Sequence, residues 1–584
     1  MVALARPRLS LTLASGLLIV VVSLAYRATF LHQGFNGGDE TWLEALALRT
    51  LHGQVPYRDF VYAVPPLTLY KETAVAGILG GAYTVLASRW VYAAEVSVGS
   101  VLAFIILRRF VSDRTALLAS IPTVFFTTIL YYYSNFNYDG QMLALVAIAV
   151  AVHRGDRRSW MVASGALLGM AFLAKPTYLA IFAVLAGTGL LRRFFEGPRR
   201  WLELVAGFAV TVGSVFGVLW VAGLWTAFRF QAFGLLVNIR RLPIKFYLYE
   251  DWPKYMTDPG QYAGTVLLAA VVFLMLGRTF MRTPAAIVMG VVLASMIPAA
   301  LVTSRFGTPT FAHLELLSSA LGLLGVINAA AALVTIAARL PRIESSGWAQ
   351  VVREQLIPPV LPVLAFSMEY LHTISVTSMR FAYVGTFLAI PVALVFLAQL
   401  ASLRPVAAAS RIAAPIVGAW IAVAGVVVLL GSPYLDGPRS EMTASFAESE
   451  LAGIRTVPAE AAHVDGLAGI IEQHTKPGDL VLVFPDGQAY YVITGRQNPT
   501  KIDWYDLLAT TPAMGQEAAA DLARRQPKLV ILQRYKETDI RRLRPLDFTK
   551  KRAWEPVYRY VIAHYTKVGS TPDADVYVLS SLAP

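Results

Sequence analysis

Hydrophobic residues in this chain gather in long runs separated by short polar connections. A bilayer core about 30 Å thick needs about 20 apolar residues per helix, and the first such run extends from about Ser10 to Thr29, behind Arg6 and Arg8. Further runs lie at about 89–108, 116–131, 140–153, 160–174, 177–191, 202–222, 261–277, 284–302, 315–338, 356–374, 381–400 and 412–431. The pattern predicts about thirteen membrane-spanning helices. A signal peptide is the alternative for the first run, but no small-x-small cleavage motif follows it.

The run 67–86 is ambiguous, because it carries Lys71 and Glu72 and is interrupted by Gly80-Gly81. The positive-inside rule places short basic connections in the cytoplasm. If the N-terminus is cytoplasmic, all of these basic connections lie in the cytoplasm only when 67–86 does not cross the membrane. We therefore predict a juxtamembrane helix at the outer interface and a C-terminal segment outside. In the alternative, 67–86 crosses and one short pair, such as 160–191, is miscounted.

Composition supports a membrane protein and changes the meaning of the net charge. The chain of 584 residues is 56% hydrophobic and 15% charged, whereas soluble domains are about 45–50% apolar and about 25% charged. The net charge of +13 would suit a nucleic-acid partner, but much of it lies in the short connections, where it orients spans. We therefore predict no nucleic-acid partner. The sequence has no cysteine, which excludes disulfides, thiolate catalysis and Cys-ligated metals.

The domain organisation follows from a change of composition near residue 435. Residues 1–434 are predicted to form a polytopic α-helical membrane domain with a first outer loop at 30–88. Residues 435–584 are more charged, and alternate short β-like runs (480–484, 529–532 and 576–579) with helical stretches (461–474 and 514–525). This alternation indicates a small α/β domain outside the membrane.

Two carboxylates stand side by side in the first outer loop, at the start of a helical stretch that continues to about His52. They are Asp39 and Glu40, and they follow Phe35-Asn36-Gly37-Gly38. One interpretation is helix capping, since acidic groups satisfy free N–H groups and complement the helix dipole. The other is chemistry, because a carboxylate at a bilayer surface can act as general base for an acceptor hydroxyl.

In the first outer loop, Asp-Glu is followed by Gly53-x-x-Pro-Tyr-Arg-Asp-Phe60 and then by Pro65-Pro66-Leu67. This order of motifs after the first span resembles the GT-C superfamily of membrane glycosyltransferases. It is similar to the branch that contains the protein O-mannosyltransferases and the lipid A aminoarabinose transferase. The resemblance is best over the first 200 residues, and none of the motifs is stringent alone. It implies an active site on the non-cytoplasmic side and a polyprenyl-phosphate sugar donor.

The resemblance also implies roles for the acidic residues. Asp39 matches the first-loop residue taken as catalytic base, and Glu40, its usual neighbour, would orient Asp39 or bind acceptor. Asp139, in Tyr133-Ser-Asn-Phe-Asn-Tyr-Asp-Gly140, stands where the family places a second acidic residue. An N-cap of the following span is a compatible interpretation of Asp139.

A departing lipid phosphate needs cations, because negative charge builds there as the bond to the sugar breaks. Lys71, Arg58, Lys175 and Arg305 are the outer candidates. Relatives carry a basic residue near the Pro-Pro motif that precedes Lys71, although not at its spacing, and basic residues at the places of Lys175 and Arg305. Lys175 lies in Ala-Lys-Pro between two short spans. A charge in such an apolar hairpin costs free energy, so Lys175 is a functional candidate. The alternative is that its side chain snorkels to the lipid headgroups.

Four further residues are candidates for acceptor binding or for a lid. His313 follows Arg305 in one outer loop, as in relatives, and a satisfied interfacial histidine is the alternative. Arg240 and Arg241 lie in the loop 223–260, which would form a lid over the donor or an interfacial amphipathic helix. Tyr490, in the outer domain, would stack on sugar or acceptor, or belong to the core.

The resulting expectation is an inverting glycosyltransferase of the bacterial inner membrane, with the C-terminal domain periplasmic and a role in envelope glycoconjugate assembly. Its partners would be a polyprenyl-phosphate sugar and a lipid, glycan or protein acceptor. No metal is required if cations stabilise the phosphate, but Asp39, Glu40 and Asp139 could hold a divalent ion, so metal dependence stays open. One alternative is a polysaccharide polymerase or ligase. Another is a transporter or flippase, but the sequence lacks the broken, paired repeats that are typical of transporters.

Overall fold

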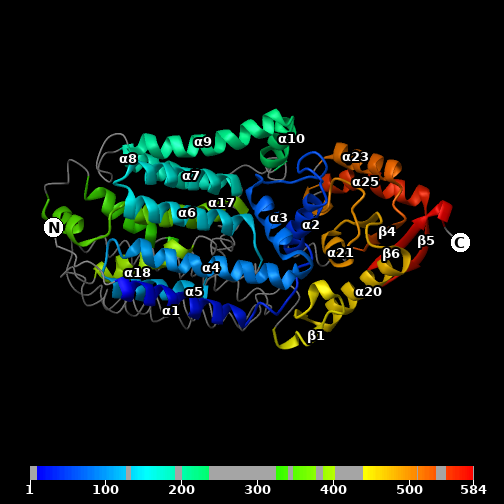
Figure 1. The fold of residues 1–584 in the computed structure, drawn as a ribbon, viewed down its shortest axis with the longest axis horizontal. Coiled ribbons are helices and arrows are strands. Elements are labelled where there is room, and N and C mark those ends of the chain that lie inside the picture. Colours follow the sequence, from blue (N-terminus) through cyan, green and yellow to red (C-terminus); the bar gives the residue numbers. More distant parts are fainter. Residues whose placement is uncertain are drawn as a thin grey trace.

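The computed structural model of the protein describes residues 9–126, 133–190, 200–235, 324–325, 327–339, 346–376, 386–400, 439–508, 511–534 and 548–582. A bundle of helices forms one part, an α/β unit forms the other, and α2 and α3 lie between them (Figure 1). The helices of the first part are α1 (Leu9–Ala28), α2 (Asp39–Leu51), α3 (Leu67–Leu79), α4 (Val85–Leu107), α5 (Asp113–Phe126), α6 (Phe136–Arg154), α7 (Arg158–Ala174), α8 (Leu179–Leu190), α9 (Arg200–Val221), α10 (Trp225–Arg229), α16 (Gly347–Gln355), α17 (Val360–Val376) and α18 (Thr386–Leu400).

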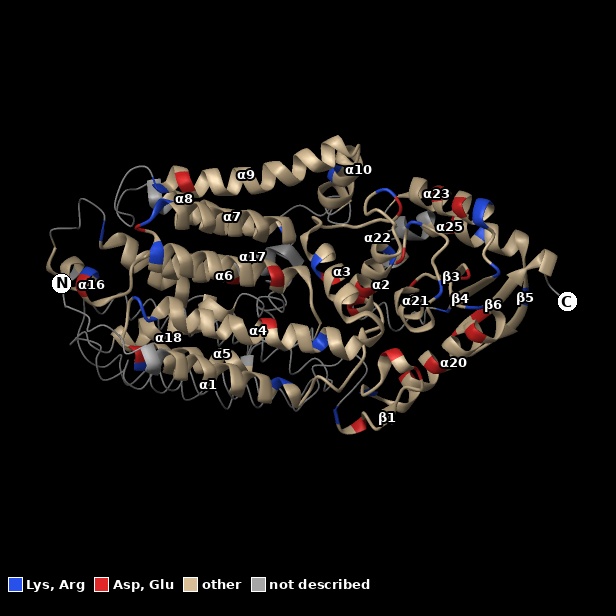
Figure 2. Cartoon of the chain, viewed as in Figure 1, with Lys and Arg blue, Asp and Glu red and all other residues tan. Residues whose placement is uncertain are grey.

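Within these residues, α4 and α9 are each long and apolar enough to cross a bilayer. Ala349–Gln355 and Val360–Glu369, bent by 73° at their junction, make a third candidate if they are taken as one span. The predicted runs 261–277, 284–302 and 412–431 lie outside the described residues, so the count of thirteen stays a prediction. Charged residues are sparse along the described part of the bundle and gather at its ends and in the α/β unit (Figure 2).

The ambiguous run 67–86 forms a short helix rather than a long one. Helix α3 has 13 residues and is followed by a 3-10 turn at Gly80–Ala82. Gly80 adopts a positive φ of 53° there, a conformation that glycine adopts at little cost. At 1.5 Å per residue the helix is about 20 Å long, which is shorter than a bilayer core. Helix α3 packs on α2, at the end of the bundle that faces the α/β unit (Figure 1).

Helices α7 and α9 approach each other closely through glycines. A Cβ at Gly207 would collide with the carbonyl oxygen of Val162, and one at Gly165 with that of Leu204. Small residues are what allow two helix backbones to come this near in a membrane. The contact therefore requires glycine at both positions.

We expect Gly207→Ala to lower the free energy of unfolding by about 1–3 kcal/mol, because the added methyl group pushes the two helices apart. Thermal unfolding of the purified protein in detergent measures this. Gly213→Ala, on the same helix but with open space around the new methyl group, is the control and should change stability little. Equal losses from both variants would contradict the close contact.

The α/β unit is built on a four-stranded sheet in the order β3-β4-β6-β5. Strands β3 and β4 are parallel, and β6 pairs antiparallel with both β4 and β5. A separate pair, β1 with β2, is antiparallel. The elements are β1 (Ala444–Ser445), β2 (Arg455–Thr456), α20 (Pro458–His474), β3 (Val481–Phe484), α21 (Gln488–Thr494), α22 (Tyr505–Leu508), α23 (Pro512–Arg525), β4 (Leu529–Gln533), α25 (Phe548–His564), β5 (Tyr565–Ser570) and β6 (Ala574–Leu579).

Alternate residues of β3 and β4 face two different cores, as the period of two in a strand requires. Val481 and Val483 pack with residues of α20. Leu482 and Phe484 pack with residues of α23 and α25, in a cluster that also includes Trp42 of α2 and other side chains of the first loop. The sheet therefore shares one apolar core with the loop between α1 and α4.

Candidate active site

Asp39 is the first residue of α2, so the predicted helix begins where the sequence placed it. Asn36 organises this start: its side-chain oxygen accepts hydrogen bonds from the N–H groups of Gly38 (3.2 Å) and Asp39 (3.1 Å). The Asn36 amide nitrogen also donates to Asp39 Oδ2 at 3.4 Å. The N-cap residue is Gly38, so Asp39 complements the helix dipole from the first turn without being the cap. The residue as a whole is half-buried.

Glu40, in contrast, is buried in an ion pair. Its carboxylate accepts hydrogen bonds from Arg89 Nε (2.6 Å) and Nη2 (2.9 Å), and both side chains are 2% exposed. Arg89 also donates to the carbonyl oxygens of Leu31 and Gly34, both at 2.6 Å. Burial of this kind leaves Glu40 no surface for an acceptor. An orienting role remains, since Glu40 Oε2 accepts the N–H of Asn36 at 3.4 Å.

Lys71 and Asp139 meet at the end of the bundle. Lys71 Nζ, on α3, forms an ion pair with Asp139 and donates to Ser134, and lies 3.3 Å from Glu95 Oε2 on α4. Three segments far apart in sequence thus place one cation among two carboxylates and a hydroxyl. The Lys71 side chain is 31% exposed, whereas that of Asp139 is 4% exposed.

The electrostatics keep Lys71 charged. Burial alone would lower the pKa of Lys71, but the carboxylates of Asp139 and Glu95 outweigh it and raise the pKa above its ordinary value. Asp139 Oδ2 and the side-chain amide of Gln141 are buried without a hydrogen-bond partner among the described residues. Such groups are costly unless water or a ligand satisfies them. These two groups near the start of α6 therefore suit a polar ligand.

The turn between α7 and α8 holds the segment that precedes Asp139. Lys175 is 6% exposed; its Nζ donates to Asn137 Oδ1 at 2.5 Å and lies 5.6 Å from the centroid of the Phe136 ring. The Tyr178 hydroxyl donates to the carbonyl oxygen of Asn137 at 2.7 Å. Asn135 is the N-cap of α6, which corrects the capping interpretation of Asp139, a first-turn residue.

The other predicted residues are scattered. Arg58 is exposed and pairs with Asp59 at 2.9 Å, not with the cluster around Lys71. Tyr490 is buried in the core that joins α20 and the sheet, so the core interpretation fits its position better than stacking on a sugar. The remaining predicted residues lie outside the described residues: Arg240, Arg241, Arg305 and His313.

A three-carboxylate metal site is not formed by the predicted set. No group of three or more histidine, aspartate or glutamate side chains placed to hold a metal ion occurs in the part of the chain that the structure describes. Asp39, Glu40 and Asp139 all lie in that part, so they do not gather around one position.

Sequence reasoning missed Arg89, Glu95 and Ser134. Arg89 and Glu95 stand at the outer end of an apolar run, where a charged residue costs free energy and usually has a partner or a function. That free-energy cost was the signal in the sequence that could have identified Arg89 and Glu95 as candidates. Ser134 gave no signal of its own, because serine is common in connections.

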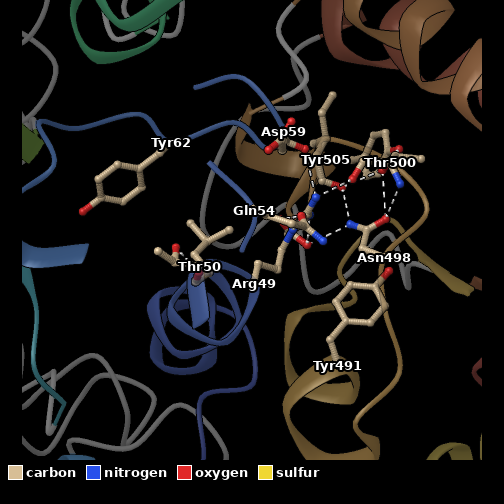
Figure 3. Close-up of polar contacts among 12 residues, drawn as sticks. Arg49, Thr50, Gln54, Asp59, Tyr62, Tyr491, Asn498, Thr500 and Tyr505 are labelled. Atoms are coloured by element: carbon tan, nitrogen blue, oxygen red, sulfur yellow. Dashed lines mark hydrogen bonds and ion pairs between the residues drawn. The ribbon is translucent and has the colours of Figure 1, made fainter. Parts of the chain in front are cut away.

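The first loop is fixed to the α/β unit by a buried network around Arg49 of α2 (Figure 3). Arg49 Nη1 donates to both Asp503 oxygens, at 2.9 and 2.8 Å. Nε donates to Gln54 Oε1 at 2.7 Å, and Nη2 to the carbonyl oxygens of Asp59 (3.0 Å) and Thr500 (3.2 Å). Every N–H of the guanidinium thus has an acceptor. The helix that begins with Asp39 is thereby held by residues of the C-terminal unit.

Comparison with known proteins gives one family match and several distant structures. Residues 85–237 match the domain of unknown function DUF6311. No curated protein matches the chain.

Among solved structures, the chain is similar to the oligosaccharyltransferase of Archaeoglobus fulgidus tethered with an acceptor peptide (13% identity, 98% of this chain and 74% of that chain, TM-score 0.45). The chain is also similar to the same archaeal enzyme, AglB, in complex with an inhibitory peptide and a dolichol-phosphate (13% identity, 98% of this chain and 75% of that chain, TM-score 0.45). ArnT from Cupriavidus metallidurans in the apo state is 16% identical over 98% of both chains, with a TM-score of 0.43. TM-scores below 0.5 do not establish a shared fold, so no role is carried over from these proteins.

Proposed function

We propose that the protein is a membrane glycosyltransferase that moves a sugar from a polyprenyl-phosphate carrier to an acceptor hydroxyl on the outer face of a bacterial inner membrane. The observation that carries the proposal is the position of Lys71. A charged, partly exposed ammonium group is held at the end of an apolar bundle, in the same loop whose motifs resemble GT-C enzymes. A lipid-linked phosphate would arrive at such a place from the membrane side.

In the proposed reaction, Asp39 removes the proton from the acceptor hydroxyl while its oxygen attacks the anomeric carbon. The bond between that carbon and the phosphate oxygen breaks, and the polyprenyl phosphate leaves with the bonding electron pair. A single displacement of this kind inverts the anomeric centre. Asp39 suits the role of base better than Glu40 because Asp39 is only half-buried, whereas the Glu40 side chain is buried in its ion pair with Arg89.

Lys71 would stabilise the leaving phosphate. An ammonium group has three donors, and the contacts of Lys71 Nζ with Asp139, Ser134 and Glu95 engage all three. The contact with Glu95, at 3.3 Å, is the longest of the three. We infer that a donor phosphate takes the place of Glu95, while Asp139 and Ser134 keep the ammonium in position. Lys175 would act indirectly, by holding Asn137.

The test is an assay of the purified full chain with a panel of polyprenyl-phosphate sugars and candidate acceptors. Release of free polyprenyl phosphate together with a glycosylated product supports the proposal. Parallel reactions with a chelator and with added Mg²⁺ or Mn²⁺ measure metal dependence. Uptake of a sugar lipid into vesicles without any glycosylated product would instead favour a transporter, and would overturn the proposal.

We expect Lys71→Met to lower turnover by about 10²- to 10³-fold, the usual loss when one preorganised donor to a developing negative charge is removed. Lys71→Arg, which keeps the charge, should retain more activity. Because Lys71→Met also leaves Asp139 buried without its cation, thermal unfolding of each variant is measured alongside turnover. The double variant Lys71→Met, Asp139→Asn removes the unpaired charge, so it should regain stability and stay inactive; recovered turnover would contradict the role.

A further inference from the structure

A polar cleft lies where the end of the first helix meets the α/β unit, and none of the residues of the Lys71 cluster lines it. It has a volume of about 340 Å³ and is lined by His32, Gln33, Ser445, Gly453 and Arg455. Its size is at the lower end of the range of small-molecule sites. The cleft is thus a separate place where a ligand could be bound.

Three of its side chains form a row across paired backbone segments. Arg455 of β2 pairs with Ser445 of β1 on one side and with Gln33 of the first loop on the other. The N–H of Arg455 donates to the carbonyl oxygen of His32, and its own carbonyl oxygen accepts the N–H of Gly34, both at 2.8 Å. Laterally paired residues present their side chains on the same face. The row is therefore fixed by backbone hydrogen bonds and not by the side chains themselves.

The groups in this row have unused hydrogen-bonding capacity. The Arg455 side chain is exposed, and its guanidinium has no hydrogen bond or ion pair with the residues that the structure describes. Gln33 Oε1 is buried and has no donor among those residues. The cleft thus offers a cation together with an acceptor that needs a donor. A ligand with an anionic group and a hydroxyl would satisfy both.

The cleft stands at the boundary between an apolar surface and a polar one. Helix α1 exposes Leu13, Leu17 and Leu18, and ends at Ala28. The His32 ring, whose Nδ1 contacts the carbonyl oxygen of Gly453 at 2.9 Å, stands edge-on to the partly exposed Trp90. Tryptophan is enriched where membrane spans meet water. The cleft thus lies beyond the C-terminal end of α1 and next to Trp90, where we expect lipid headgroups.

We propose that this cleft binds the headgroup of an anionic phospholipid that carries free hydroxyl groups, such as a phosphoglycerol headgroup. Arg455 pairs with the phosphate, and Gln33 Oε1 accepts a hydrogen bond from a headgroup hydroxyl. Ser445 lies next to Arg455 and contributes its hydroxyl group. Because the row joins the first loop to the α/β unit, a bound lipid contacts both parts at the membrane surface.

Native mass spectrometry of the full chain, titrated with phosphatidylglycerol and with phosphatidylcholine, tests the proposal. Phosphatidylglycerol should bind at least about tenfold more tightly, and Arg455→Gln should weaken its binding about tenfold, as expected for loss of a charge-assisted contact. The strand pairing is made by the backbone, so this variant should unfold at the wild-type temperature. Arg559→Gln, which replaces an exposed arginine on α25, is the matched control and should bind like wild type.

Gln33→Leu and soluble competitors separate the parts of the proposal. Gln33→Leu should weaken binding of phosphatidylglycerol more than binding of phosphatidic acid, which has no glycerol headgroup. Failure of glycerol phosphate or inorganic phosphate to compete supports a lipid as the ligand, whereas full competition by glycerol phosphate at equal concentration overturns the lipid assignment. Equal binding of both phospholipids, or wild-type binding by Arg455→Gln, overturns the site.

Discussion

Replacing Asp39 with asparagine is expected to lower kcat by about 10²- to 10⁴-fold and to leave KM for the donor nearly unchanged. A general base contributes that much, and it acts only as the acceptor proton is transferred, so its loss affects the transition state and not ground-state binding. Asparagine keeps the size of the side chain and its place beside Asn36. Steady-state kinetics with a working donor, together with thermal unfolding, measure the effect.

Asp113→Asn is the matched control for this prediction. Asp113 also stands in the first turn of a helix, α5, and pairs with Arg108 at 3.3 Å, but it has no role in the proposed reaction. It should turn over like wild type. Near wild-type turnover by Asp39→Asn would remove the base assignment, and a large loss confined to Asp139→Asn would transfer that role to Asp139.

Arg49→Ala is expected to lower the free energy of unfolding by about 3–5 kcal/mol, the usual cost of removing one partner of a buried ion pair. The side chain of Asp503 is 0% exposed, so it would keep a buried charge whose main remaining donor is Asn498 Nδ2, at 2.8 Å. The carbonyl oxygens of Asp59 and Thr500 would lose their donor as well. Thermal unfolding in detergent and the rate of proteolytic release of the C-terminal unit measure the effect.

A nearby surface arginine provides the control for this variant. Arg58 pairs with Asp59 in the same loop, but its side chain is 62% exposed, and exposed pairs contribute about 1 kcal/mol at most. Arg58→Ala should therefore unfold close to the wild-type temperature. If Arg49→Ala and Arg58→Ala behave alike, the network in Figure 3 does not hold the two parts together.

Local features of the fold could be predicted from the sequence because their causes are local. The helix expected from Asp39 to about His52 is observed as Asp39–Leu51, since Asn36 and the acidic first turn fix its start. The three β-like runs appear as β3, β4 and β6. Their alternation and the turns between them are visible in short windows of sequence.

The partners within the site could not be predicted in the same way. Neither the pairing of Lys71 with Asp139 nor that of Glu40 with Arg89 was predicted from the sequence. Residues 49 positions apart meet in the latter pair, and no periodicity in the sequence reports such a contact. The hydrogen bond from Lys175 to Asn137 also results from tertiary packing.

The network around Arg49 also bears on how the protein is made. Arg49 and Asp503 are 454 residues apart, and a ribosome that adds about 5–20 residues per second needs on the order of 20 to 90 seconds to cover that distance. During this interval the first outer loop has neither its ionic partner nor the sheet that completes its apolar core. The loop that begins the proposed active site is thus among the first parts synthesised and among the last to gain all of its packing partners.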